Sequence, residues 1–210
     1  MFLEHDIQQH CQIDFDSFIK VYEAINHEMW HLYGLKQTTK EELRYQRFYK
    51  AFQYFGYDNL NLSHTWADDY LAISPYKTHL IDGAIDVLMH LQESYQLHII
   101  TNGFKEVQHI KLDYSNLKPY FKHIIISEEH GFNKPDIKIF DLAQSLTYAQ
   151  QHECVMIGDN YDADILGALN AKWKAIYLSE NVKNNTDQNF IQIKRLIELK
   201  FDSNQKTFAG

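Results

Sequence analysis

The sequence predicts an α/β protein in which a doubly wound, parallel, Rossmann-like sheet follows a helical domain. After Pro75, short apolar runs rich in β-branched residues alternate with amphipathic helical stretches. Before Pro75, apolar residues recur at helical spacing and there is no strand signal. Only three prolines and eight glycines occur in 210 residues, which excludes collagen-like and disordered chains.

Residues 1–74 form the first predicted domain, an all-helical unit. Their apolar side chains recur three and four positions apart, which places them on one face of a helix. Gly34 and Gly56 divide the region into three or four helices. Side chains that accept hydrogen bonds from first-turn N–H groups are suitable N-caps, and three residues are well placed for this role: Asp14, Thr39 and Ser63.

Residues 75–210 form the second predicted domain, an α/β core. The predicted strands are the apolar runs at 97–100, 124–127, 154–157 and 175–178. The predicted helices lie at 83–94, 104–112, 136–147, 162–171 and 188–199. Strict alternation of strand and helix predicts right-handed crossovers and a parallel sheet buried on both faces.

The composition indicates a cytoplasmic protein and excludes several classes of partner. A formal net charge of −8 repels nucleic acid and anionic membrane surfaces, although a local phosphate site remains open. Cys11 and Cys154 lie far apart without metal-binding spacing, so we expect no disulfide. The chain has no run of about 18 apolar residues and no secretion signal at its start, so we expect neither a membrane span nor export.

Polar residues follow three of the four predicted strands. After the first strand, Thr101, Asn102 and Gly103 offer a hydroxyl, an amide and backbone N–H groups that suit a phosphate. Lys134, held by the next proline just before a helix, can offset phosphate charge. The carboxylates of 159–164 follow the third strand and are the oxygen ligands that Mg²⁺ prefers. Because ligands bind beyond the carboxyl ends of parallel strands, we expect one shared site.

Each signal also has a purely structural interpretation. Thr-Asn-Gly is commonly no more than a turn and cap, a single lysine is usually solvated, and acids in a first helical turn are favoured by the helix dipole. The order and spacing of the three motifs together favour the functional interpretation.

The chain resembles the haloacid dehalogenase superfamily. Its second, third and fourth motifs match Thr101-Asn102-Gly103, Lys134-Pro135, and Gly158-Asp159 with Asp164. The flanking segments ITNGF, ISEEHGFNKPDIKIF and IGDNYDADILGALNA are similar to the pyrimidine-nucleotidase-like phosphatases, which carry a helical cap. The cap pattern of that subgroup is similar here at Asn26, Trp30, Tyr33 and Arg47-Phe48.

The resemblance implies a Mg²⁺-dependent phosphatase that hydrolyses a small phosphomonoester, in particular a nucleoside 5'-monophosphate, through an aspartyl-phosphate. It implies that Asp159 binds the metal and that Thr101, Asn102 and Gly103 hold the phosphate. Lys134 would offset charge on the phosphoryl oxygens, and Asp164 would orient Lys134 or a metal-bound water. The helical cap would close over the site and choose the leaving group.

The first motif of the family, an apolar strand ending in Asp-x-Asp-x-Thr, is absent from the sequence. The most similar segment is Asp14-Phe15-Asp16-Ser17, in which we interpret Asp14 or Asp16 as the N-cap of a helix. By resemblance, about 20 to 30 residues of the usual family layout are missing ahead of Met1. We therefore expect that the central strand of the sheet is missing, between the strands that end at Thr101 and near Asp159, and that the chain as printed is inactive because it lacks the nucleophile.

Two alternatives remain open. The incomplete sheet would expose strand edges near 97–101 and 154–158, so the chain could instead be a non-catalytic binding protein or a homodimer. His27-Glu28-Met29-Trp30-His31 also matches the HExxH signature of zinc peptidases, with Glu41 or Glu42 as a third ligand. The position of the third histidine in the extended signature holds Gln37, which weakens the zinc interpretation.

Overall fold

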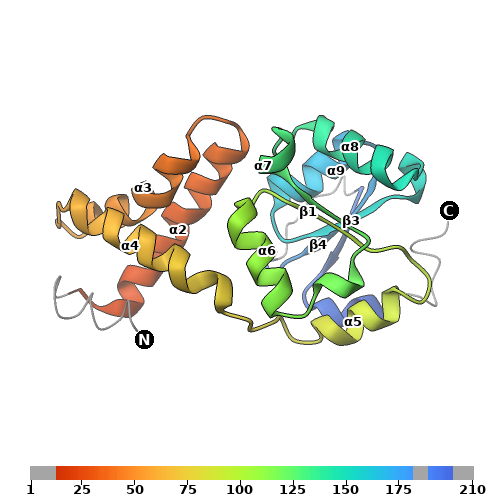
Figure 1. The fold of residues 1–210 in the computed structure, drawn as a ribbon, viewed down its shortest axis with the longest axis horizontal. Helices are drawn as coiled ribbons and strands as arrows, with labels where there is room; N and C mark the ends of the chain where they lie inside the picture. The colour runs from red at the N-terminus through yellow and green to blue at the C-terminus, as the bar shows by residue number, and fades with distance from the viewer. Residues whose placement is uncertain (1–12, 182–188, 201–210) are drawn as a thin grey trace. The chain divides into compact units, whose positions relative to one another are not determined.

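The computed structural model describes residues 13–181 and 189–200 (Figure 1). The chain divides into two compact units, Met1–Ser74 and Pro75–Gly210. The second unit has parallel strands with helices packed on both faces, so the predicted α/β fold class is confirmed. None of the described helices is both long and apolar enough to cross a membrane.

The first unit is built from three described α-helices: α2 (Phe15–Gly34), α3 (Lys40–Tyr54) and α4 (Leu60–Ile73), the last running into the short turn η2 (Ser74–Tyr76). Its core is aromatic, because Phe18, Phe52 and Trp66 are almost fully buried. The rings of Phe52 and Trp66 lie 4.9 Å apart in an edge-to-face arrangement that adds to their area burial.

The helix starts follow the predicted caps in two of three cases. Asp14 accepts hydrogen bonds from the backbone N–H and hydroxyl of Ser17, and these bonds lower the pKa of Asp14. Thr39 forms a reciprocal capping box at the start of α3. The prediction of Ser63 as a cap is wrong. Asn59 caps α4 by accepting from the N–H of Leu62 at 2.9 Å, so the helix begins one turn earlier, and the buried Ser63 hydroxyl donates to the carbonyl of Asn59.

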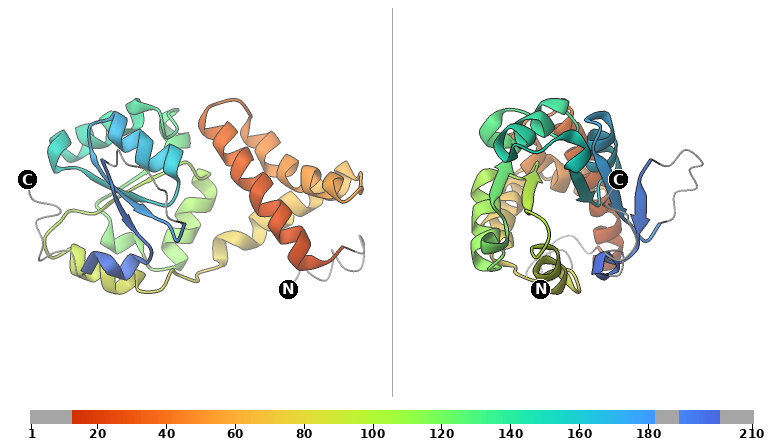
Figure 2. Two further views of the ribbon diagram at one scale, coloured as in Figure 1. Left: turned by 180° about the vertical axis from the view of Figure 1, so that it is seen from behind. Right: turned by 90° about the vertical axis from the view of Figure 1, so that its right-hand side faces the viewer.

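The second unit contains five described strands: β1 (His98–Thr101), β2 (His123–Ile126), β3 (Val155–Gly158), β4 (Lys174–Leu178) and β5 (Ile191–Ile193). Each pair of neighbours is parallel. The strands form two separate sheets, β2–β1 and β3–β4–β5, which can be followed in both views of Figure 2.

Helices connect the strands in the order expected for a doubly wound fold. The α-helices are α5 (Ala84–Leu91), α6 (Lys105–Tyr114), α7 (Ser127–His130), α8 (Ile137–Thr147) and α9 (Gly167–Asn170). The shorter turns are η3 (Lys118–Tyr120), η4 (Gln151–Glu153), the π-helical η5 (Tyr161–Leu166) and η6 (Leu196–Lys200).

Two hydrophobic clusters cover the two faces of the strands. One cluster packs α8 and α9 against side chains that include Ile125 and Met156. The other packs α5 and η6 against side chains that include Ile176 and Ile193. Burial on both faces explains why the strands read as continuous apolar runs in the sequence.

The predicted helix at 188–199 is wrong. The short run Ile191–Ile193 instead pairs in parallel with β4, and a 3₁₀ turn follows at Leu196–Lys200. Pairing with β4 satisfies backbone groups and buries Ile193, so a tertiary contact overrides the helical spacing. Residues 182–188, which include the predicted start of that helix, lie outside the described residues.

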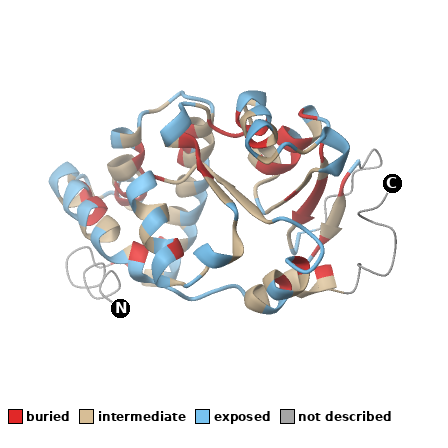
Figure 3. Cartoon of the chain, turned by 45° about the vertical axis from the view of Figure 1, so that its right-hand side comes forward, coloured by how far each residue is buried: buried red, intermediate tan, exposed pale blue. Residues whose placement is uncertain are grey.

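The sheet is interrupted at the place where the sequence predicts a missing strand. Within the described residues, β1 pairs with β2 and β3 pairs with β4, but β1 and β3 do not pair with each other. All four residues of β1 are only partly buried, whereas Ala175, Ile176 and Tyr177 of β4 are buried (Figure 3). The strands beside the interruption therefore have less cover than the strand in the middle of a sheet.

Candidate active site

A buried ion pair lies beyond the carboxyl ends of β1 and β3. The side chains of Lys134 and Asp164 are 9% and 6% exposed, and Nζ lies 2.6 Å from Oδ1. The same ammonium group donates to the carbonyl oxygen of Ile100 at 2.8 Å. Buried charges are tolerated only when they are paired and hydrogen-bonded, so Lys134 is not the solvated surface lysine of the structural interpretation.

Asn102 fixes the backbone of Lys134. Its Oδ1 accepts from the N–H of Lys134 at 2.8 Å, and its Nδ2 donates to the carbonyl of Lys134 at the same distance. This two-point contact joins the residue after β1 to the segment that precedes α8. The amide of Asn102 therefore positions the lysine and is already occupied by protein groups.

Thr101 closes the turn after β1. The N–H of Gly103 donates to Thr101 Oγ1 at 3.0 Å, and both residues are partly exposed. A threonine hydroxyl has one proton to donate and two lone pairs, so one donor and one acceptor position remain for a ligand.

Asp164 is held from both sides. While its Oδ1 faces Lys134, its Oδ2 accepts from the N–H of Asn160 at 3.1 Å. A Cβ atom at Gly158 would overlap the side chain of Asp164, so only glycine leaves room for the carboxylate. The side chain of Asn160 caps η5 by accepting from Ala163 N at 2.9 Å. The π-helical turn thus directs Asp164 back toward the end of β3.

Asp159 is the exposed carboxylate of the site, directly after β3. Its oxygens suit Mg²⁺. Within the described residues, no group of three or more His, Cys, Asp or Glu side chains is close enough to hold a metal ion. Both oxygens of Asp164 are already used by Lys134 and Asn160. The described residues therefore offer one carboxylate that suits Mg²⁺ but no complete set of ligands.

The structure thus brings Asn102, Lys134 and Asp164 into one hydrogen-bonded network, with Thr101 and Gly103 on the adjacent turn and Asp159 beside Gly158. Sequence reasoning missed the carbonyl of Ile100, which has no signature because every residue has one. It also missed Ser127, a fully buried residue at the end of β2 whose Oγ has no hydrogen-bond partner in the described part of the chain. Its position as the polar last residue of the predicted strand 124–127 was the available signal.

The HExxH residues lie along α2 in the first unit. His27 and Glu28 are exposed, and within the described residues neither Glu41 nor Glu42 forms a three-ligand group with the two histidines. The zinc interpretation therefore lacks its third ligand in the described residues.

Residues 13–178 match the family described as haloacid dehalogenase-like hydrolase. The chain belongs to this hydrolase family. Among its curated relatives is the HAD-hydrolase YfnB of Bacillus subtilis, 30% identical over 187 residues that cover 85% of this chain and 76% of YfnB. The crystal structure of YfnB bound to magnesium superposes with a TM-score of 0.80 at 27% identity, covering 95% of this chain and 88% of that one.

Two further relatives in the hydrolase family are pyrimidine 5'-nucleotidases. YjjG of Escherichia coli is 30% identical over 180 residues, which cover 85% of this chain and 76% of YjjG. PynA of Streptococcus pneumoniae is 31% identical over 182 residues, which cover 82% of this chain and 73% of PynA. The resemblance to pyrimidine-nucleotidase-like members of the family is therefore confirmed by the comparisons.

Proposed function

We propose that this chain is the cap and core of a Mg²⁺-dependent phosphatase whose substrate is a small phosphomonoester, specifically a nucleoside 5'-monophosphate. The observation that carries the proposal is the Lys134–Asp164 pair, held by Asn102 at the carboxyl ends of β1 and β3. An ammonium group kept nearly dry at this edge is suited to stabilise charge on a phosphoryl oxygen. YjjG and PynA, which are named pyrimidine 5'-nucleotidases, support the choice of nucleotides.

Each side chain of the site has a distinct task in this proposal. Lys134 offsets charge on the phosphoryl group, and Asp164 keeps the ammonium oriented. Thr101 and the backbone after it hold the phosphate at the start of α6. Asp159 would hold Mg²⁺, which when bound supplies charge neutralisation. The described residues fit this ion only in part, so no step of the reaction is derived from it.

The nucleophile is not among the printed residues, because the sequence contains no Asp-x-Asp-x-Thr. Asp14, the nearest candidate, is engaged as the cap of α2. We therefore propose that the 210-residue chain releases no phosphate, and that an aspartate at the end of a strand between β1 and β3 would complete the enzyme through an aspartyl-phosphate.

The test compares the printed chain with a version extended ahead of Met1 by an apolar strand ending in Asp-x-Asp-x-Thr. Both are assayed against nucleoside 5'-monophosphates and sugar phosphates, with Mg²⁺ and with a chelator. We expect phosphate release only from the extended version, only with Mg²⁺, and with preference for nucleotides. In that version Lys134→Met and Asp159→Asn should each lower the rate about 100-fold or more.

The matched control is Asp113→Asn, since Asp113 lies on α6 in an exposed pair with Lys118 and should not affect the rate. No activity from a folded extended version on any phosphomonoester would refute the assignment. Metal-dependent activity of the printed chain that survives Asp14→Asn and Asp16→Asn but is lost in Asp159→Asn would refute the proposed inactivity.

A further inference from the structure

The side chain of Gln108 is folded back over the turn at residues 101–103. Gln108 lies at the end of the first turn of α6 and is partly exposed. A Cβ atom at Gly103 would overlap the Gln108 amide and would lie 2.7 Å from its Cδ. Gly103 does not have the positive φ that favours glycine, so the close approach of this amide explains why the residue is a glycine.

The amide of Gln108 makes no hydrogen bond with another group in the described chain. The nearby amide of Asn102 is occupied at both ends by the backbone of Lys134. The first N–H of α6, that of Lys105, donates to the carboxylate of Glu128 at 2.9 Å. A carboxamide can donate two hydrogen bonds and accept two. Gln108 therefore brings an amide with free donors to this turn.

The Gln108 amide and the Thr101 hydroxyl both adjoin Gly103. Thr101 Oγ1 accepts from the N–H of Gly103 at 3.0 Å, so that N–H is already used within the protein. A phosphoryl group presents several terminal oxygens, all of which accept hydrogen bonds, so its site needs more than one donor. Because Gln108 is held by packing on a glycine, its amide can turn to a ligand without breaking a hydrogen bond within the protein.

We propose that Gln108 is a substrate-contacting residue, whose amide donates a hydrogen bond to a phosphoryl oxygen next to the one held by Thr101. This role rests on the proposed phosphatase function and adds to it a residue outside the three motifs. The amide is neutral, so it supplies a directed donor and leaves the offsetting of charge to Lys134.

The experiment titrates inorganic phosphate into the full 210-residue chain and follows its amide signals by NMR. The side-chain signal of Gln108, assigned by its loss in Gln108→Met, should shift together with the backbone N–H signals of Asn102 and Gly103. Gln144 is the control, because it is also a partly buried glutamine on a helix, and its amide donates to the carbonyl of Ala149 at 3.4 Å. The Gln144 signal should stay in place.

Variants of the same two glutamines measure the contribution to affinity. Gln108→Met keeps the length of the side chain but removes the donor, so the affinity for phosphate should fall about tenfold or more. Gln108→Glu keeps the shape but places a carboxylate beside the phosphate, and should weaken binding further. Gln144→Met should bind phosphate as the parent chain does.

A double variant tests whether Gly103 acts through Gln108. The Cβ added in Gly103→Ala should displace the flexible end of the Gln108 side chain and lower the affinity about as much as Gln108→Ala does. When both residues are alanine, the added Cβ has no amide to displace. The loss should then equal that of either single variant, and a loss equal to the sum of the two would overturn the proposal.

The titration also distinguishes the role of Gln108 from the phosphatase function. Phosphate that shifts Asn102 and Gly103 but not the Gln108 amide, or that binds equally well to Gln108→Met, overturns the role of Gln108 and leaves the phosphatase function standing. No phosphate binding at the turn contradicts both. Binding that depends on Gln108, without phosphate release by the extended version, supports the role of Gln108 and contradicts the phosphatase function alone.

Discussion

Lys134 and Asp164 form an ion pair in a setting where water hardly reaches either side chain. The cost of removing two charges from water is offset by their short contact and by further hydrogen bonds from Asn160 and to Ile100. Replacing only one member of such a pair strongly destabilises the fold, because the remaining charge stays buried without a partner.

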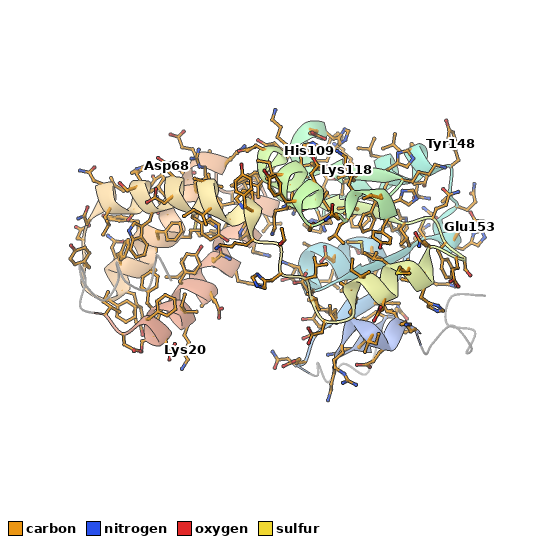
Figure 4. All side chains as sticks on the ribbon, turned by 60° about the horizontal axis from the view of Figure 1, so that its bottom comes forward. Lys20, Asp68, His109, Lys118, Tyr148 and Glu153 are labelled. Carbon is orange, nitrogen blue, oxygen red and sulfur yellow. The ribbon has the colours of Figure 1, made fainter. Side chains whose placement is uncertain are left out.

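The first prediction concerns this asymmetry. Asp164→Asn should lower the free energy of unfolding by about 3–5 kcal/mol, since it leaves the ammonium of Lys134 without its anion. Asp68→Asn is the matched control, because Asp68, labelled in Figure 4, pairs with Arg44 at 2.7 Å with its side chain 72% exposed. The control should cost about 1 kcal/mol or less. Urea unfolding of the three proteins provides the measurement.

A double variant separates charge from packing at the same position. Lys134→Met with Asp164→Leu removes both charges at similar volume and should recover most of the stability lost in Asp164→Asn. Equal losses in Asp164→Asn and Asp68→Asn would show that the buried pair contributes no more than an exposed one, which is the outcome that contradicts the prediction.

Pairing of β1 with β2 places two imidazoles side by side. His98 lies opposite His123 in the register, and their rings stack with centroids 5.2 Å apart. The pKa of His98 is lowered mainly by burial, and to a smaller extent by the charges of His123 and Lys122. The folded chain therefore binds this proton more weakly than the unfolded chain, and the stability that His98 contributes is present above about pH 6.5 and lost as the pH falls through its folded pKa.

The second prediction follows from the lowered pKa of His98 in the folded chain. Between about pH 7 and pH 5, the fall in the free energy of unfolding should be smaller in His98→Gln than in the parent chain. His152→Gln, at an exposed position in η4, should leave the slope unchanged. Chemical denaturation at a series of pH values provides the comparison, and identical slopes for the parent and His98→Gln would rule out the proposed linkage.

The third prediction concerns the start of α4. Asn59→Ala should destabilise the first unit by about 1 kcal/mol, since it removes the acceptor for the N–H of Leu62. Asn61 is the second residue of the same helix and is exposed. Asn61→Ala should leave the stability nearly unchanged or raise it slightly. Thermal unfolding followed by circular dichroism distinguishes the two, and equal midpoints for both variants would contradict the role of Asn59.

Elements whose pattern is local were predicted well from the sequence. The four apolar runs become β1 to β4 within one residue at each end. Strands that are buried on both faces appear in the sequence as continuous apolar runs, so they can be predicted without knowing which strands they pair with. Two predictions failed where a tertiary or competing contact decides the outcome. Pairing with β4 converts 191–193 into a strand, and Asn59 starts α4 before Ser63.

In the candidate site, too, local features could be predicted from the sequence and tertiary contacts could not. Its side chains were identifiable because they follow strands of a parallel sheet, where ligand-binding residues gather. Their contacts were not identifiable. The pairing of Asn102 with the backbone of Lys134, and the bond from Lys134 to the carbonyl of Ile100, join positions more than thirty residues apart and depend on how the loops pack.

The whole molecule consists of two units with separate hydrophobic cores. The aromatic core of the first unit contains only residues before Ser74, and both clusters of the second unit contain only residues after Pro75. Between them, residues 78–80 belong to no helix or strand, are exposed, and make no backbone hydrogen bond with another backbone group in the described chain. A segment of this kind opens at little cost in free energy.

The fourth prediction is that brief digestion with trypsin cleaves first after Lys77, which is exposed at the start of this segment. Lys36 and Lys172 are also exposed, but each lies in a tight turn whose N–H is bonded, to Tyr33 and to Leu169, so a protease must first break those turns. Mass spectrometry should therefore detect one fragment for each unit as the first products from the described region. Lys77→Gln should abolish this cut, because the next lysine or arginine toward the C-terminus is Lys105, within α6. Earlier cleavage within α3 or α6 would show that the helices open more readily than the connection, contrary to the separation of the two cores.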